Sequence, residues 1–318
     1  SGEQLAAKVL VETGGAVPRF NREYEALARL NHPGIVRVYH YGIHRGRPWF
    51  TMELLEGRTL QSWVKSKGKP GTKGRTDEVL RIGYYVAEAL DYIHSRGLVH
   101  RDLKSANVLV MHDGRIKLLD FGTAQIRDAY ENITQEGEFL GTFAYASPEQ
   151  FRGDEVDARA DIYCLGVLLY RLATGRRPFN SNKPAELARM HTKLAAKPPS
   201  DWVADLPDGL DELILDMMAK DREDRPERAR DVARRLSKIA GQPMSLPPIS
   251  VQMASERTLG RDKELRTLST VLDGKPGRAV LVITDFTNAR VHVGVSSNEA
   301  ADLKSGQQAT ISFPGLGG

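Results

Sequence analysis

The sequence predicts an α+β protein with a small β-rich front lobe, a larger helical lobe and a small β-rich appendage at the end. Strand-like runs dominate the first 55 residues, amphipathic helical patterns fill the region up to residue 241, and β-branched alternation returns after residue 279. We therefore expect a front lobe at 1–55, a helical lobe at 56–241, a linker at 242–255, and a short helix with strands of unknown role at 256–318.

Composition places the chain among soluble globular proteins. Its 318 residues are 41% hydrophobic and 27% charged, which excludes wholesale disorder and the collagen-like and coiled-coil classes. No apolar run approaches the roughly 20 residues that cross a bilayer. A single cysteine, Cys164, is typical of a reducing compartment, so we expect a cytoplasmic protein without a membrane span. The net charge of +4 is too small to indicate nucleic-acid binding.

The front lobe is expected to contain three strands and one helix. Residues 4–10 predict a strand, and residues 19–30 carry the apolar spacing of an amphipathic helix, which His32-Pro33-Gly34 ends. Two strand-like runs at residues 35–41 and 48–54 predict a hairpin.

The helical lobe begins with a short helix at residues 60–65. The basic, glycine-rich stretch 65–75 predicts a surface loop rather than a nucleic-acid site, because no aromatic side chains interleave with its charges. Asp77 is expected to cap the next helix, whose apolar residues recur at spacings of three and four. Residues 162–173 are almost entirely apolar and predict a central buried helix, followed by helices at 185–194, 210–219 and 226–236.

Three β-rich runs near the end of the chain predict a small separate sheet. They lie at residues 279–283, 291–295 and 309–313, after a proline-bearing linker. We expect this tail to be a structural or regulatory appendage without chemistry of its own.

An ordered set of polar residues carries the chemistry. His100-Arg101-Asp102-Leu103-Lys104-Ser105-Ala106-Asn107 precedes an apolar run, and Asp120-Phe121-Gly122 follows thirteen residues after Asn107. Taken singly, each Asp or Asn could simply cap a turn. As an ordered set they resemble the catalytic loop and the metal-binding triplet of protein kinases. The resemblance covers residues 1 to about 240 and implies the bilobal protein-kinase fold.

This resemblance implies a role for each residue of the set. Phosphoryl transfer requires an aligned hydroxyl and neutralised phosphate charge. Asp102 would accept the proton of the substrate hydroxyl, and Lys104 would balance charge on the transferring phosphate. Asn107 and Asp120 would supply the oxygen ligands of Mg²⁺.

The nucleotide side of the site is implied by further matches. Ala6-Ala7-Lys8 resembles the strand that carries the kinase lysine, and Glu23 would be its ion-pair partner, although a solvated helix carboxylate is the alternative for Glu23. The remaining residues implied to bind ATP are the gatekeeper Met52, the hinge residues Glu53 and Leu55, and Ala6 and Leu109, which would enclose adenine.

Other matches imply structural roles. The run Gly141 to Glu149 resembles the end of the activation segment, and Glu149 is expected to form a buried bidentate pair with Arg225. Asp161 would hold the backbone of the catalytic loop, and His100 and Phe121 would belong to an apolar stack.

The arrangement of Lys104 two places after Asp102, with Thr142 further on, is similar to that of Ser/Thr kinases. Two further runs resemble the eukaryotic-type kinases of bacteria: Asn31-His32-Pro33 and the Ser-Pro-Glu-Gln ending. The implied partners are protein substrates and a second copy of the kinase for autophosphorylation.

A regulatory contact is also implied. Arg101 is expected to be a buried cation that binds a phosphate on Thr134; alternatively, a nearby glutamate such as Glu131, Glu136 or Glu138 satisfies it.

The front of the sequence departs from the family. Only seven residues precede Lys8, and the glycine-rich loop that covers ATP in this family is not among them. Two interpretations stay open: a kinase truncated at its front, or a pseudokinase that acts as a scaffold with impaired ATP binding. In either case we expect the small sheet to have an exposed edge.

Overall fold

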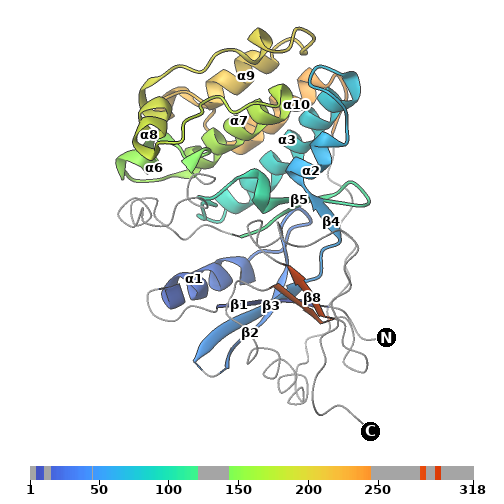
Figure 1. The fold of residues 1–318 in the computed structure, drawn as a ribbon, viewed down its shortest axis with the longest axis vertical. Coiled ribbons are helices and arrows are strands. Elements are labelled where there is room, and N and C mark those ends of the chain that lie inside the picture. The colour runs from blue at the N-terminus through green and yellow to red at the C-terminus, as the bar shows by residue number, and fades with distance from the viewer. Residues whose placement is uncertain are drawn as a thin grey trace. The chain divides into compact units, whose positions relative to one another are not determined.

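The computed structural model of this chain describes residues 5–10, 16–44, 46–120, 143–244, 280–283 and 291–294. Contacts divide the chain into two compact units. Unit 1 comprises Ser1–Tyr24, Arg37–Leu55 and Val251–Gly318, and unit 2 comprises Glu25–Val36 and Glu56–Ser250. Figure 1 shows the strands of unit 1 and the helices of unit 2.

Unit 1 is built on an antiparallel sheet of five strands in the order β2-β3-β1-β7-β8. The strands are β1 (Leu5–Val9), β2 (Val38–His44), β3 (Arg47–Glu53), β7 (Val280–Ile283) and β8 (Val291–Gly294). Helix α1 (Ala16–Ala28) follows β1, and its Phe20 ring lies 5.0 Å from the ring of Phe50 on β3. This aromatic contact fixes the start of α1 against the sheet.

The tail does not form the separate sheet that its pattern predicts. Strands β7 and β8 form where expected, but β7 pairs with β1 and therefore joins the sheet of unit 1. The predicted exposed edge is accordingly wrong for β1, because β7 covers it. The third predicted strand, 309–313, lies outside the described residues.

The hairpin of β2 and β3 forms, but β2 begins at Val38 rather than at residue 35. Ile35 instead bridges Leu118 in unit 2, and the backbone N–H of Val36 donates to the carbonyl of Leu118 at 2.9 Å. These bonds commit residues 35 and 36 to unit 2 before the strand starts.

Unit 2 combines a small sheet with a bundle of helices. The sheet has the order β4-β5-β6, with β4 (Gly57–Thr59), β5 (Val108–Met111) and β6 (Ile116–Leu118). Its helices are α2 (Leu60–Lys65), α3 (Lys73–His94), α6 (Pro148–Arg152), α7 (Ala158–Thr174), α8 (Pro184–Lys193), α9 (Leu210–Met217) and α10 (Ala229–Ile239). Short 3₁₀ turns occupy Ser105–Asn107, Pro199–Asp201 and Arg222–Asp224.

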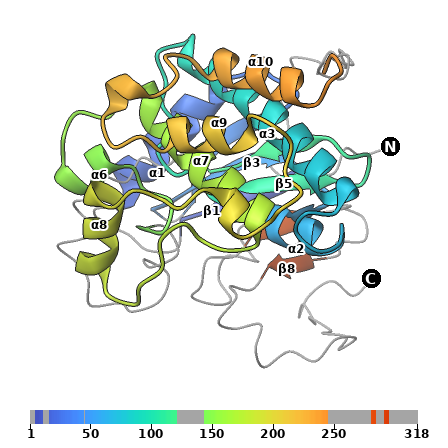
Figure 2. The same cartoon turned by 90° about the horizontal axis from the view of Figure 1, so that it is seen from above.

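Helix α7 is the central buried helix that its apolar sequence predicts. Of its 17 residues, 14 are buried. It packs against α3 and α9, and α10 covers α3 (Figures 1 and 2). Gly166 makes the close approach of α9 possible, because a Cβ there would lie 2.9 Å from Met217 Cβ and from Met218 Cγ.

Two predictions about the stretch before α3 are wrong. Thr72, not Asp77, is the N-cap, since α3 already begins at Lys73. Arg75 is buried rather than part of a surface loop, because its guanidinium donates to the carbonyls of Leu172 at 2.9 Å and Gly68 at 3.1 Å. Among the described residues, no helix has the length and apolarity needed to span a membrane.

Candidate active site

The loop between α3 and β5 brings three polar side chains of the predicted site together. The Nδ2 of Asn107 donates to the Oδ2 and to the backbone carbonyl of Asp102, both at 2.9 Å. The Nζ of Lys104 lies 2.8 Å from the same Oδ2. Asp102 is half-buried, whereas Asn107 is buried. A carboxylate held by a cation and an amide in this way is fixed in direction.

Asp161, fully buried on α7, holds the backbone of that loop. Its Oδ2 accepts from the N–H of His100 and its Oδ1 from the N–H of Arg101, both at 2.8 Å. The Nε2 of His94 lies 2.8 Å from Oδ2. Burial alone would raise the pKa of Asp161, but the hydrogen bond and charge of His94 bring it below its usual value. The anchor is therefore an anion at neutral pH.

The backbone of the loop is strained beside this anchor. Arg101 adopts a φ of 65°, in the left-handed region that a side chain other than glycine rarely occupies. The N–H groups of His100 and Arg101, which immediately precede this turn, both donate to Asp161, and these hydrogen bonds compensate the cost of the strained conformation.

Asp120 is tied to the same loop through the residue before it. The N–H of Leu119 donates to the carbonyl of Asn107 at 2.9 Å, and the Nε2 of His100 lies 3.1 Å from the carbonyl of Leu119. Asp120 itself has a φ of 42° and is exposed. The two residues predicted to hold Mg²⁺, Asn107 and Asp120, are thus joined by neighbouring backbone bonds.

Unit 1 contains the predicted lysine pair. The Nζ of Lys8 on β1 lies 2.5 Å from the Oε1 of Glu23 on α1. The Glu23 side chain is only 11% exposed, so the alternative of a solvated carboxylate is wrong. The Lys8 ammonium also lies 5.8 Å from the centre of the Phe50 ring.

The predicted hinge is the end of β3. Glu53 donates its N–H to the carbonyl of Arg37 at 2.9 Å, and its Oε1 accepts from the N–H of Arg37 at 2.8 Å. Met52, Glu53 and Leu55 are all half-buried.

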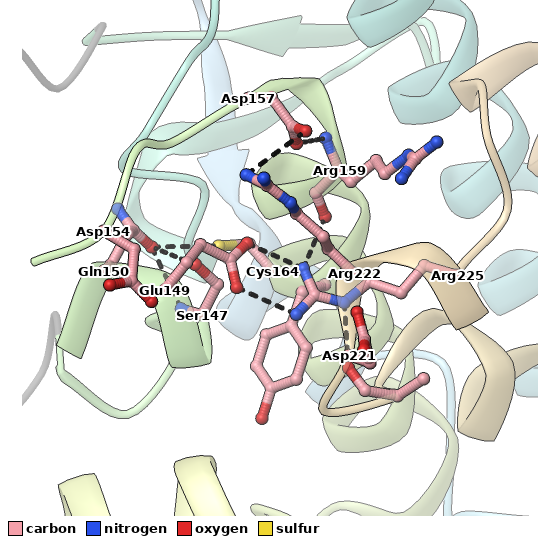
Figure 3. Close-up of polar contacts among 12 residues, drawn as sticks. Ser147, Glu149, Gln150, Asp154, Asp157, Arg159, Cys164, Asp221, Arg222 and Arg225 are labelled. Carbon is pink, nitrogen blue, oxygen red and sulfur yellow. Dashed lines mark hydrogen bonds and ion pairs between the residues drawn. The ribbon is translucent and has the colours of Figure 1, made fainter. Parts of the chain in front are cut away.

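Glu149 and Arg225 form the expected buried bidentate pair (Figure 3). The two guanidinium nitrogens Nη1 and Nη2 lie 2.7 and 2.8 Å from Oε1 and Oε2. Arg225 also donates to the carbonyls of Ala219 at 2.8 Å and Arg159 at 3.1 Å. Burial alone would raise the pKa of Glu149, but the hydrogen bonds and charge of Arg225 lower it. The pair ties α6 to the loop that precedes α10.

Comparison with known proteins decides the family. The model for the protein kinase domain matches residues 1–235. The chain belongs to the protein kinase family. Its match to the kinase domain of PknI from Mycobacterium tuberculosis has a TM-score of 0.57 and 31% identity, covering 74% of this chain and 85% of that one.

Curated relatives of this kinase domain are bacterial serine/threonine kinases. PknB of Mycobacterium tuberculosis is 37% identical over 246 residues, which is 76% of this chain and 38% of PknB. A probable serine/threonine-protein kinase of Clostridium perfringens is 34% identical over 256 residues, 80% of this chain and 36% of the relative. The chain therefore spans less than two fifths of the curated relatives that it matches. The predicted family and fold are confirmed.

Three of the predicted site residues lie outside the part of the chain that the structure describes: Phe121, Thr134 and Thr142. The expectation that Arg101 is a buried cation is wrong: its side chain is exposed, because the left-handed turn fixes its backbone to Asp161 and leaves the guanidinium outside.

The structure adds three supporting groups that the sequence analysis missed. The first is His94 on Asp161. The second is Gln150, whose Oε1 accepts from the N–H of Ser147 at 3.0 Å while its Nε2 donates to the carbonyl of Arg101 at 2.9 Å. The third is Tyr145, whose hydroxyl lies 2.6 Å from the Oγ of Ser105. Only the spacing of Ser147 and Gln150, which matches a capping box, could have revealed one of them.

Proposed function

We propose that this kinase domain transfers the γ-phosphoryl group of ATP to Ser or Thr hydroxyls of proteins. The observation that carries the proposal is the hydrogen-bonded group of Asp102, Lys104 and Asn107 on a loop anchored by Asp161. A carboxylate fixed in this way is suited to accept a hydroxyl proton, because its direction is set before the substrate arrives.

Each residue of the group has a distinct part in the proposed transfer. Asp102 would take the proton of the substrate hydroxyl as the oxygen attacks the γ-phosphorus. Lys104, 2.8 Å from Asp102, is close enough to neutralise charge on the phosphoryl group as it moves to that oxygen. Asn107 would keep Asp102 aligned through its Nδ2.

Asn107 and Asp120 fit the role of Mg²⁺ ligands. The Nδ2 of Asn107 donates to Asp102, so the side-chain oxygen Oδ1 of Asn107 is directed away from Asp102. Oδ1 is the atom that a metal would use. Among the described residues, no group of three or more His, Cys, Asp or Glu side chains is placed so that it could hold a metal ion. Mg²⁺ typically takes only one or two protein ligands beside phosphate oxygens, so two oxygen donors suffice. When bound, Mg²⁺ neutralises charge on the ATP phosphates.

Lys8 is the proposed phosphate contact, with Glu23 orienting it at 2.5 Å. Ala6, Met52, Glu53, Leu55 and Leu109 are the proposed adenine contacts. None of the described catalytic residues favours the scaffold alternative, since the proposed base, both metal ligands and the lysine pair are all present.

Regulation by the activation segment also remains a proposal. The exposed Arg101 guanidinium would bind a phosphate on Thr134, and the chain around Thr142 would then form the substrate shelf. Such phosphorylation would occur between two copies of the kinase. ATP as substrate and a buried, reduced Cys164 favour the cytoplasm as its location.

The test is to incubate the purified chain with Mg²⁺, ATP and a generic protein substrate, and to identify the modified residues by mass spectrometry. We expect phosphoserine and phosphothreonine that depend on Mg²⁺. Absence of incorporation, or phosphate on tyrosine alone, would contradict the proposal.

A further inference from the structure

The edge of β1 that faces away from β3 is occupied by a strand from the far end of the chain. Leu5, Ala6, Ala7 and Lys8 of β1 lie opposite Ile283, Val282, Leu281 and Val280 of β7 in antiparallel register. Strand β8 pairs in turn with β7, with Val293 opposite Leu281. More than 270 residues separate the partners in the sequence (Figure 1, dark red strands).

The direction of the backbone amides of β1 follows from one hydrogen bond and from the alternation of N–H groups along a strand. The N–H of Leu10 donates to the carbonyl of Pro48, which continues the pairing of β1 with β3. Because successive N–H groups of a strand point to opposite edges, Lys8 directs its N–H toward β3. Ala7 directs its N–H toward β7, where it lies opposite Leu281.

Strand β1 also carries the lysine of the candidate site. Lys8 lies opposite Phe50 on one side and Val280 on the other. Its ammonium reaches Glu23 at 2.5 Å, a contact that requires β1 to hold its register against the sheet and α1. A strand paired on one edge only exposes its amides and opens more readily than a central strand.

We propose that the hairpin of β7 and β8 is an intramolecular clamp that makes β1 a central strand and so holds Lys8 in register. The tail is then part of the N-terminal sheet and not an independent appendage. The expected effect on the KM for ATP rests on the proposed function of Lys8, whereas the pairing of β7 with β1 does not.

Hydrogen exchange of single amides in the full chain, followed by NMR, tests the clamp without any activity measurement. In the parent we expect the amides of both Ala7 and Lys8 to exchange slowly. Leu281→Pro removes the N–H that faces β1, and we expect it to accelerate exchange at Ala7 at least tenfold while Lys8 stays protected by β3. The amide of Val167, in the middle of α7, reports whether unit 2 remains folded in the variant.

Val293→Pro is the matched control. Leu281 directs its N–H toward β1, so Val282 directs its own toward β8 and pairs there with His292. Val293 then points its N–H to the outer edge, where proline removes no bond of the ladder. We expect Ala7 to stay protected in this variant. Fast exchange at Ala7 in the parent, or equal exchange in the parent and Leu281→Pro, would overturn the clamp.

Two further measurements separate the remaining outcomes. A parent that is dimeric, and that Leu281→Pro converts to a monomer, would assign the strand to a second copy and overturn the intramolecular clamp.

Steady-state kinetics should show a KM for ATP at least fivefold higher in Leu281→Pro than in Val293→Pro, with a smaller change in kcat. Equal KM values would overturn the link to Lys8. A parent without kinase activity would refute the proposed function and leave the exchange result intact.

Discussion

Glu149→Ala leaves the buried Arg225 guanidinium without its carboxylate. Loss of one partner of a buried ion pair typically costs about 3–5 kcal/mol. Arg225 would keep its hydrogen bonds to the carbonyls of Ala219 and Arg159, so we expect the lower end, about 3 kcal/mol, or on the order of 100-fold in the folding equilibrium constant. Urea denaturation followed by circular dichroism would measure the free energy of unfolding.

A neighbouring surface pair supplies the control. Arg159 lies 2.5 Å from Glu223, whose side chain is 67% exposed. We expect Glu223→Ala to cost less than about 1 kcal/mol, because water screens and replaces such a pair. If Glu149→Ala costs no more than Glu223→Ala, the argument that burial makes the Glu149–Arg225 pair important for stability is refuted.

Three further predictions concern pH and packing. Because the pKa of Glu149 is lowered, its contribution to stability is present above the ordinary value of 4.5 and is lost as the pH falls below it. The free energy of unfolding should therefore fall less steeply with decreasing pH in Glu149→Gln than in the parent, and equal slopes would contradict this. Burial lowers the pKa of Lys220 to about 8. The free energy of unfolding should therefore rise between pH 8 and pH 10 more in the parent than in Lys220→Met. Equal rises in the two proteins would argue against a desolvated ammonium. Gly166→Ala should lower the free energy of unfolding by about 1–3 kcal/mol. Gly74→Ala should raise it by about 0.4–1 kcal/mol, because a Cβ at Gly74 meets nothing within 4 Å. If thermal denaturation ranks the two variants the other way, the packing argument is contradicted.

Local patterns in the sequence were sufficient to predict much of the fold and the site. The continuous apolar run of α7 predicts a buried helix because no polar face remains for solvent. The order of Asp102, Asn107 and Asp120 predicts a site through its resemblance to protein kinases, and the structure places Asp102 and Asn107 in hydrogen-bond contact. Glu149 and Arg225, although 76 residues apart, follow from the same family pattern.

The remaining features depend on contacts between distant segments. Nothing in the composition of the tail shows which sheet β7 joins, because strand alternation is the same for any partner edge. His94 sits in the last turn of α3 like an ordinary helix-terminal residue, and only the fold brings it to Asp161. Arg75 belongs to a basic stretch, yet its guanidinium is buried, where it donates hydrogen bonds to the carbonyls of Leu172 and Gly68.

Asp102 is the proposed base of the phosphotransfer reaction. The most direct test compares the initial rate of phosphate transfer from Mg-ATP by the parent, Asp102→Asn and the control Asp113→Asn, whose carboxylate pairs with Arg115 on the surface. Loss of a positioned base typically costs a factor of 10²–10⁴. We predict a rate at least about 100-fold lower for Asp102→Asn, with unchanged affinity for ATP, and a parental rate for Asp113→Asn. Equal rates for Asp102→Asn and the parent would contradict the account.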